Sequence, residues 1–136
     1  MNMPKTLIAL TTLIGLIPAA LVANPPLREV PAIDNEIFYG AVANEIDEHC
    51  DSIVGLRAKA ITKLLQLRSQ ANAMGYTDAE IRAYVESDAE KARMRARGEA
   101  YLAANGVKYG QPETFCALGR AEIARNSAIG VYLKAK

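Results

Sequence analysis

The chain has 136 residues, of which 51% are hydrophobic, so it is long enough for one small domain and no more. It carries 16 basic and 15 acidic residues, a balance that argues against a nucleic-acid binder driven by net charge and against a disordered polyanion. One His and two Cys are too few for a zinc finger, an iron–sulfur site or a scaffold of several disulfides.

Residues 1–23 differ from the rest of the chain. Lys5 is their only charged side chain, and Thr6 to Val22 is apolar apart from three Thr, one Gly and one Pro. This pattern predicts a signal peptide that is cleaved after Ala23, and therefore a periplasmic or secreted protein. The alternative is an uncleaved membrane anchor, because about 17 apolar residues just span a bilayer. With cleavage, the membrane is met only through the leader, and the remaining chain holds 15 basic and 15 acidic residues.

Cys50 and Cys116 are the only cysteines. An isolated pair in an exported chain is typical of a disulfide, because the compartment is oxidising. The bridge would close a loop of roughly 67 residues and would stabilise the fold by about 4 kcal/mol. A redox-active pair is the alternative, but the chain has no C-x-x-C motif.

The predicted domain begins after an extended, proline-rich arm over residues 24–33. A first helix is expected from Asp34, as its N-cap, to Cys50. Its apolar stripe repeats every four residues and ends at Cys50, which therefore faces the core. The members of this stripe are Phe38, Val42, Ile46 and Cys50.

A second helix is predicted over residues 53–74, with Gly75 as its stop. Apolar residues cover nearly half of its circumference, which predicts that it is the central helix of the domain. They are Leu56, Ala60, Ile61, Leu64, Leu65, Leu67, Ala71 and Met74.

Two capping boxes follow, one at residues 77–80 and one at residues 87–90. The first predicts a short helix, and the second predicts a helix that ends near Asn105, before Gly106. Pro112 is suited to the first position of another helix, whose inner side would hold Phe115, Cys116, Gly119 and Ile123. No segment alternates apolar and polar residues over the length of a strand. The sequence therefore predicts an all-α domain over residues 34–136, a single bundle of four to six helices.

Four segments resemble a small exported alphaproteobacterial family that is known only as domain of unknown function 5333. They are Gly75–Ile81, Ser87–Ala96, Phe115–Arg120 and Ser127–Gly130. The resemblance extends over about Leu27 to Lys136. It implies a helical periplasmic domain, and it transfers no catalytic or binding residue.

Glu45 and His49 lie one helical turn apart and are the candidate metal ligands. A third ligand would have to come from elsewhere in the chain. A partly buried histidine that pairs with Glu45 explains the same spacing.

Two other charged features have a structural and a functional interpretation. Lys91, Arg93, Arg95 and Arg97 alternate along a helix and therefore point to two opposite sides, as expected of a solvated surface with pairs from Glu90 to Arg93 and from Arg95 to Glu99. Glu122 falls within an apolar stripe. It is expected to pair with Arg120 or Arg57, and the alternative is a proton-donating acid with a raised pKa.

The sequence offers no catalytic residue and implies no cofactor, because its one His has no nucleophilic partner and no loop is built to hold phosphate. We therefore interpret the chain as an exported binding or accessory protein. Its expected partner is an envelope protein or a small ligand, with no role in nucleic-acid binding. The alternatives are a small metal-dependent enzyme that uses His49 with Glu45, and a carrier of a small apolar ligand between the helices.

Overall fold

The computed structural model describes residues 21–136. The predicted leader, residues 1–23, lies almost entirely outside this range. The chain forms five α-helices, two short 3-10 helices and two three-residue strands. In chain order they are η1 (Leu27–Glu29), α1 (Pro31–His49), β1 (Ile53–Gly55), α2 (Arg57–Ala73), α3 (Asp78–Glu86), α4 (Asp88–Ala104), α5 (Pro112–Ala124), η2 (Gly130–Tyr132) and β2 (Leu133–Ala135).

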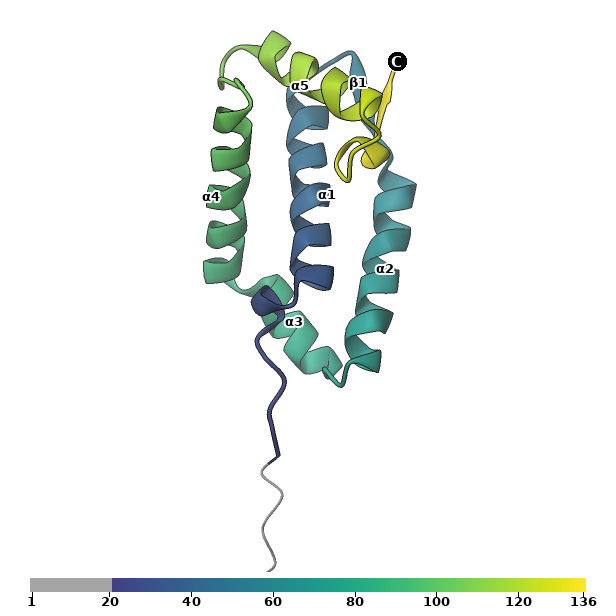
Figure 1. Ribbon diagram of the computed structural model, residues 1–136, viewed down its shortest axis with the longest axis vertical. Coiled ribbons are helices and arrows are strands. Elements are labelled where there is room, and N and C mark those ends of the chain that lie inside the picture. The colour runs from purple at the N-terminus through teal and green to yellow at the C-terminus, as the bar shows by residue number, and fades with distance from the viewer. Residues whose placement is uncertain (1–20) are drawn as a thin grey trace, which may run out of the picture.

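Helix α1 lies between α4 and α2, and the three run side by side along the long axis of the molecule (Figure 1). Helix α3 crosses one end of this arrangement, and α5 crosses the other. The predicted all-α fold with four to six helices is therefore confirmed. Among residues 21–136, no helix is both long and apolar enough to cross a membrane.

Helix α1 is the central helix, because it contributes to both hydrophobic clusters. The larger cluster joins its Phe38, Val42 and Ile46 to α4 and α5, and the smaller one joins its Ile33 to α2 and η1. The prediction that residues 53–74 form the central helix is wrong. Helix α2 buries only Leu67 and Ala71, and it leaves Ile61, Leu64 and Leu65 exposed.

Helix α1 also begins earlier than predicted. Its first residue is Pro31, whose fixed φ and missing N–H suit the first helical position, and Asp34 lies buried in the first turn instead of capping the helix. The preceding arm is docked on the domain. Leu27 and Val30 are buried, and the Tyr76 hydroxyl donates a 2.5 Å hydrogen bond to the Pro25 carbonyl.

The predicted disulfide is confirmed: Cys50 and Cys116 are bonded, with their Cα atoms 5.2 Å apart. The bridge joins the end of α1 to α5. Helix α5 approaches closely at Gly119, where a Cβ atom would lie 2.4 Å from the Ile53 side chain. A glycine is therefore required at this crossing.

The sequence analysis missed a small antiparallel sheet. Ile53–Gly55 pairs with Leu133–Ala135, with Val54 opposite Lys134. The segment predicted to open the second helix thus forms a strand, and the chain after η2 ends as its partner. Three residues are too few to show an alternating pattern, so this pairing has no signature in the sequence.

The local signals for helix ends were more reliable. Thr77 and Glu80 form a complete capping box. Ser87 accepts from the Glu90 amide, but the Glu90 side chain turns away to Arg93, so the second box is only half formed. Gly106 takes a φ of +80° just after α4, and Pro112 opens α5 as predicted.

Candidate functional site

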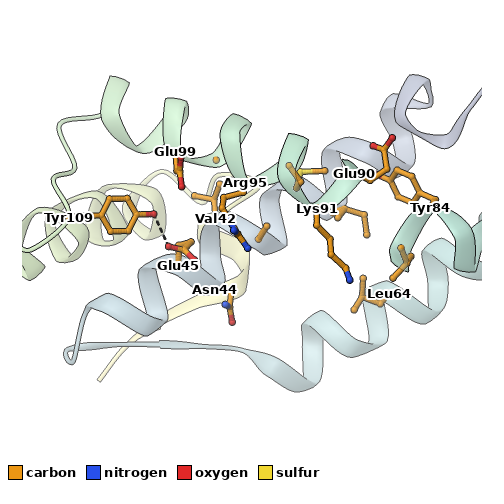
Figure 2. A pocket seen from close by; sticks show the side chains of 15 residues that line it. Val42, Asn44, Glu45, Leu64, Tyr84, Glu90, Lys91, Arg95, Glu99 and Tyr109 are labelled. Atoms are coloured by element: carbon orange, nitrogen blue, oxygen red, sulfur yellow. Dashed lines mark hydrogen bonds between the residues drawn. The ribbon is translucent and has the colours of Figure 1, made fainter. Parts of the chain in front are cut away.

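A groove of about 380 Å³ lies over α1, between α4 and α2, and opens to solvent (Figure 2). Its lining is mostly apolar and comes from three helices. The apolar side is formed by Ile37, Ala41 and Val42 of α1, Leu64 of α2, and Met94 and Gly98 of α4. A concave apolar surface of this size lies within the range of ligand-binding sites in proteins.

Charged side chains of both signs line the groove. Lys91 and Arg95 project from α4, and Glu45 projects from α1 (Figure 2). The Glu45 carboxylate accepts a 2.9 Å hydrogen bond from the Tyr109 hydroxyl at one end of the groove. The same side chains that stand at the rim are therefore tied to neighbouring elements at the acidic end and project from a single helix at the basic side.

The basic run of α4 is divided between two sides, as its alternation predicted. Lys91 and Arg95 line the groove, whereas Arg93 and Arg97 turn inward to the carboxylate of Asp34. The expected pair between Arg93 and Glu90 forms at 2.8 Å. The interpretation of the whole run as a solvated surface is wrong for Arg93 and Arg97, because their partner is a buried acid that was assigned to a helix cap.

Asp34 is the centre of a polar cluster that joins α1, α3 and α4. Its carboxylate accepts from Arg97 at 3.0 Å, from the Tyr84 hydroxyl at 2.7 Å, and from Arg93. Burial raises the pKa of this carboxyl, but hydrogen bonds from Arg93 and Tyr84, with the charges of Arg93 and Arg97, outweigh burial. The net pKa of Asp34 is therefore lower than its ordinary value, and the group is held as an anion.

The His49–Glu45 pair lies beside an aromatic cluster. His49 Nε2 is 3.6 Å from Glu45 Oε2, and the imidazole stacks on Phe115 with a 4.5 Å centroid distance. Tyr109 contacts the same ring edge-on. Within the described part of the chain, no group of three or more His, Cys, Asp or Glu side chains could hold a metal ion. This arrangement matches the structural interpretation, in which the histidine packs against the core and pairs with Glu45.

Glu122 is fully buried and hydrogen-bonded, with different partners from those predicted. Arg125 donates to its carboxylate at 2.6 Å, and Tyr101 and Ser127 donate as well. The expected pairing with Arg120 or Arg57 is wrong. Arg125 lies one helical turn further along α5, and Ser127 follows the end of that helix. The carboxylate thus fixes the turn after α5 against α4, which is a structural role.

Tyrosine hydroxyls hold several of these acids. Tyr109 donates to Glu45, and Tyr132 donates to Glu36. Burial, followed by the hydrogen bond to the acid, raises the pKa of each tyrosine to about 12. Both phenols therefore stay neutral over the physiological range and act as fixed donors.

The sequence analysis missed both Asp34 and the groove. Pro31 was the available signal for Asp34, since a proline at the first helical position moves the fourth residue into the first turn. No local signal marks the groove, because it depends on how far three helices stand apart.

The model of a family described as "Family of unknown function (DUF5333)" matches residues 25–134. No curated protein and no solved structure matches the chain.

Proposed function

We propose that this chain, which belongs to the DUF5333 family of unknown function, is an exported, non-catalytic binding protein that receives an apolar surface in its groove. The groove over α1 is the observation that carries the proposal. Apolar surface that is concave and open to water is costly to leave uncovered, so its occupation by apolar groups is favourable.

The polar side chains around the groove support binding rather than chemistry. Glu45 is engaged by Tyr109, and Glu90 is engaged by Arg28 and Arg93. Lys91 and Arg95 are cations without a nearby nucleophile or base of the kind that acyl or phosphoryl transfer needs. Such side chains orient a bound partner and contribute specificity.

A dye-binding experiment tests the groove directly. At low protein concentration, an environment-sensitive apolar dye is expected to bind the protein with increased fluorescence. Gly98→Leu fills the groove from α4 and is expected to weaken dye binding by about 1 kcal/mol, or roughly fivefold in affinity. A Cβ atom at Gly98 meets nothing within 4 Å, so the substitution leaves the fold intact.

Gly40→Leu is the matched control for Gly98→Leu. Gly40 is also a helical glycine with open space around its Cβ position, but it does not line the groove. We expect this variant to bind the dye as the unmodified protein does. Equal dye binding by both variants would contradict the assignment of the groove.

The disulfide supports the proposed location. A bond between Cys50 and Cys116 persists in the periplasm or outside the cell, where the environment is oxidising. The predicted cleavage after Ala23 also leaves the docked arm, which begins beside it, free to follow the body of the domain.

Intact-mass measurement of the protein from its native cells tests export. The expected product begins at Asn24 and does not react with a thiol-alkylating reagent unless it is first reduced. A product that retains residues 1–23 and takes up two alkyl groups without reduction would overturn the assignment to an oxidising compartment.

A further inference from the structure

We propose that the occupant of the groove is helix α2 of a second copy of this chain, so that the protein forms a two-fold symmetric dimer. This inference rests on the proposed role of the groove as a binding surface. It accounts for two features at once, because the groove lacks an occupant within the described chain and α2 has an apolar strip without a cover.

The strip on α2 consists of Ile61, Leu64 and Leu65, which are 59%, 52% and 62% exposed. Leu64 lines the groove, and the other two lie within one helical turn of it (Figure 2). The strip therefore borders the groove on the same face of the molecule. Three neighbouring aliphatic side chains that are each more than half exposed are typical of an interaction surface.

The charges on α2 have one sign only. Its 17 residues include four basic ones and no acidic one: Arg57, Lys59, Lys63 and Arg68. Arg57 lies four residues before Ile61 and seven before Leu64, so the helical repeat places it in line with the strip, at its N-terminal end. Its side chain is 78% exposed, with only a 3.4 Å pair to Asp47.

The groove has the opposite sign at one end. Along α1 its floor changes from Ile37 and Ala41 to Glu45, and Glu48 continues the same side of the helix. The Glu48 carboxylate accepts a 2.8 Å hydrogen bond from Asn44, which lines the groove. Glu99 of α4 lies at this end as well (Figure 2). The end of the groove near the C-terminus of α1 is therefore acidic.

The helix directions make these two surfaces complementary. Helix α2 runs opposite to α1, as its position and colour show in Figure 1. A two-fold axis parallel to the helices, between two facing grooves, keeps the direction of α2 and places it over the partner's α1. The N-terminal end of α2, with Arg57, then meets the acidic end of the other groove. Each copy gives one strip and receives one, so the assembly closes as a dimer.

A basic helix with an apolar strip could also bind an anionic lipid surface. The charges on this face favour the second copy instead. Glu45, Glu48 and Glu99 lie on the same face as the strip and would repel an anionic bilayer, whereas they attract Arg57 of a partner.

Sedimentation-velocity measurements over a range from low micromolar to several hundred micromolar test the proposal on the purified full-length protein. We expect a monomer–dimer equilibrium. Leu65→Glu is expected to raise the dimer dissociation constant by at least about tenfold, because it places a charge where an apolar side chain is buried. Met74→Glu is the matched control: Met74 is 42% exposed at the end of the same helix but does not line the groove.

A charge exchange separates this dimer from unspecific association. Arg57→Glu and Glu48→Arg are each expected to weaken the dimer by a few fold, and the double variant is expected to restore most of the loss. Added salt should weaken the dimer of the unmodified protein. A dimer that is indifferent to Leu65→Glu and to the exchange would overturn the proposal.

Two further outcomes would also overturn it. One is a protein that remains monomeric throughout the range while the dye still binds in a manner sensitive to Gly98→Leu, which would leave the groove as a binding site for something other than this chain. The other is a monomer that binds anionic phosphatidylglycerol vesicles through Leu65, which would identify a lipid surface as the occupant. Loss of both dimer and dye binding would refute the proposed function itself.

Discussion

Replacement of both cysteines by alanine is expected to lower the free energy of unfolding by about 4 kcal/mol. The bridge connects residues that are 66 positions apart, so its loss greatly increases the conformational freedom of the unfolded chain. A domain of this size has a typical net stability of about 5–15 kcal/mol. The Cys50→Ala, Cys116→Ala variant should therefore lie close to the threshold of folding.

Urea denaturation with and without a reductant checks this expectation. Reduced unmodified protein and the double variant should unfold at similar, lower urea concentrations, and oxidised protein at a higher one. Alanine is preferable to serine at Cys50, because this position is only 1% exposed and a hydroxyl there would be buried. A difference of less than about 1 kcal/mol between oxidised protein and the double variant would contradict a stabilising role for the bridge.

The features that sequence reasoning predicted correctly depend on neighbouring residues. The capping box of Thr77 and Glu80, the stop at Gly106 and the start at Pro112 each act within one helical turn. The disulfide was predictable for another reason, since only two cysteines are present and only one pairing exists.

The features that sequence reasoning missed depend on distant partners. The strand at Ile53 is defined by a segment about 80 residues later, and its own three residues are compatible with either a strand or a helix. The apolar face of α2 was correctly found, but amphipathicity does not say which neighbour covers a helix. In the structure its central part, Leu64 with Ile61 and Leu65, stays exposed.

The candidate site shows the same division. The alternation from Lys91 to Arg97 correctly predicted two sides of α4, whereas the buried acid on one of them could not be inferred. For Glu122, the true partner Arg125 lies three residues away, within the range where helical side chains meet. The prediction failed because it looked for a partner on another helix.

Asp34→Ala is expected to destabilise the fold by about 2–3 kcal/mol, because it leaves two arginines and a tyrosine without their shared acceptor. The effect falls below that of a fully buried ion pair, since the Arg93 and Arg97 side chains are 31% and 36% exposed. Each arginine also keeps one contact: Arg93 pairs with Glu90, and Arg97 lies 4.0 Å from the centre of the Phe38 ring. Urea denaturation at neutral pH measures the loss.

The pH dependence of the same variant identifies the cause. The pKa of Asp34 is lower in the folded protein than in the unfolded chain, so its ionised form stabilises the fold at pH values above about 4. That contribution is lost as the pH falls through the folded value. Asp34→Ala should therefore lose less stability than the unmodified protein between neutral pH and about pH 3. Asp78 and Glu80 also have lowered pKa values and are present in both proteins, so their contribution cancels in the comparison. Parallel stability curves for the two proteins over this range would show that the Asp34 carboxylate does not hold α1, α3 and α4 together through its charge.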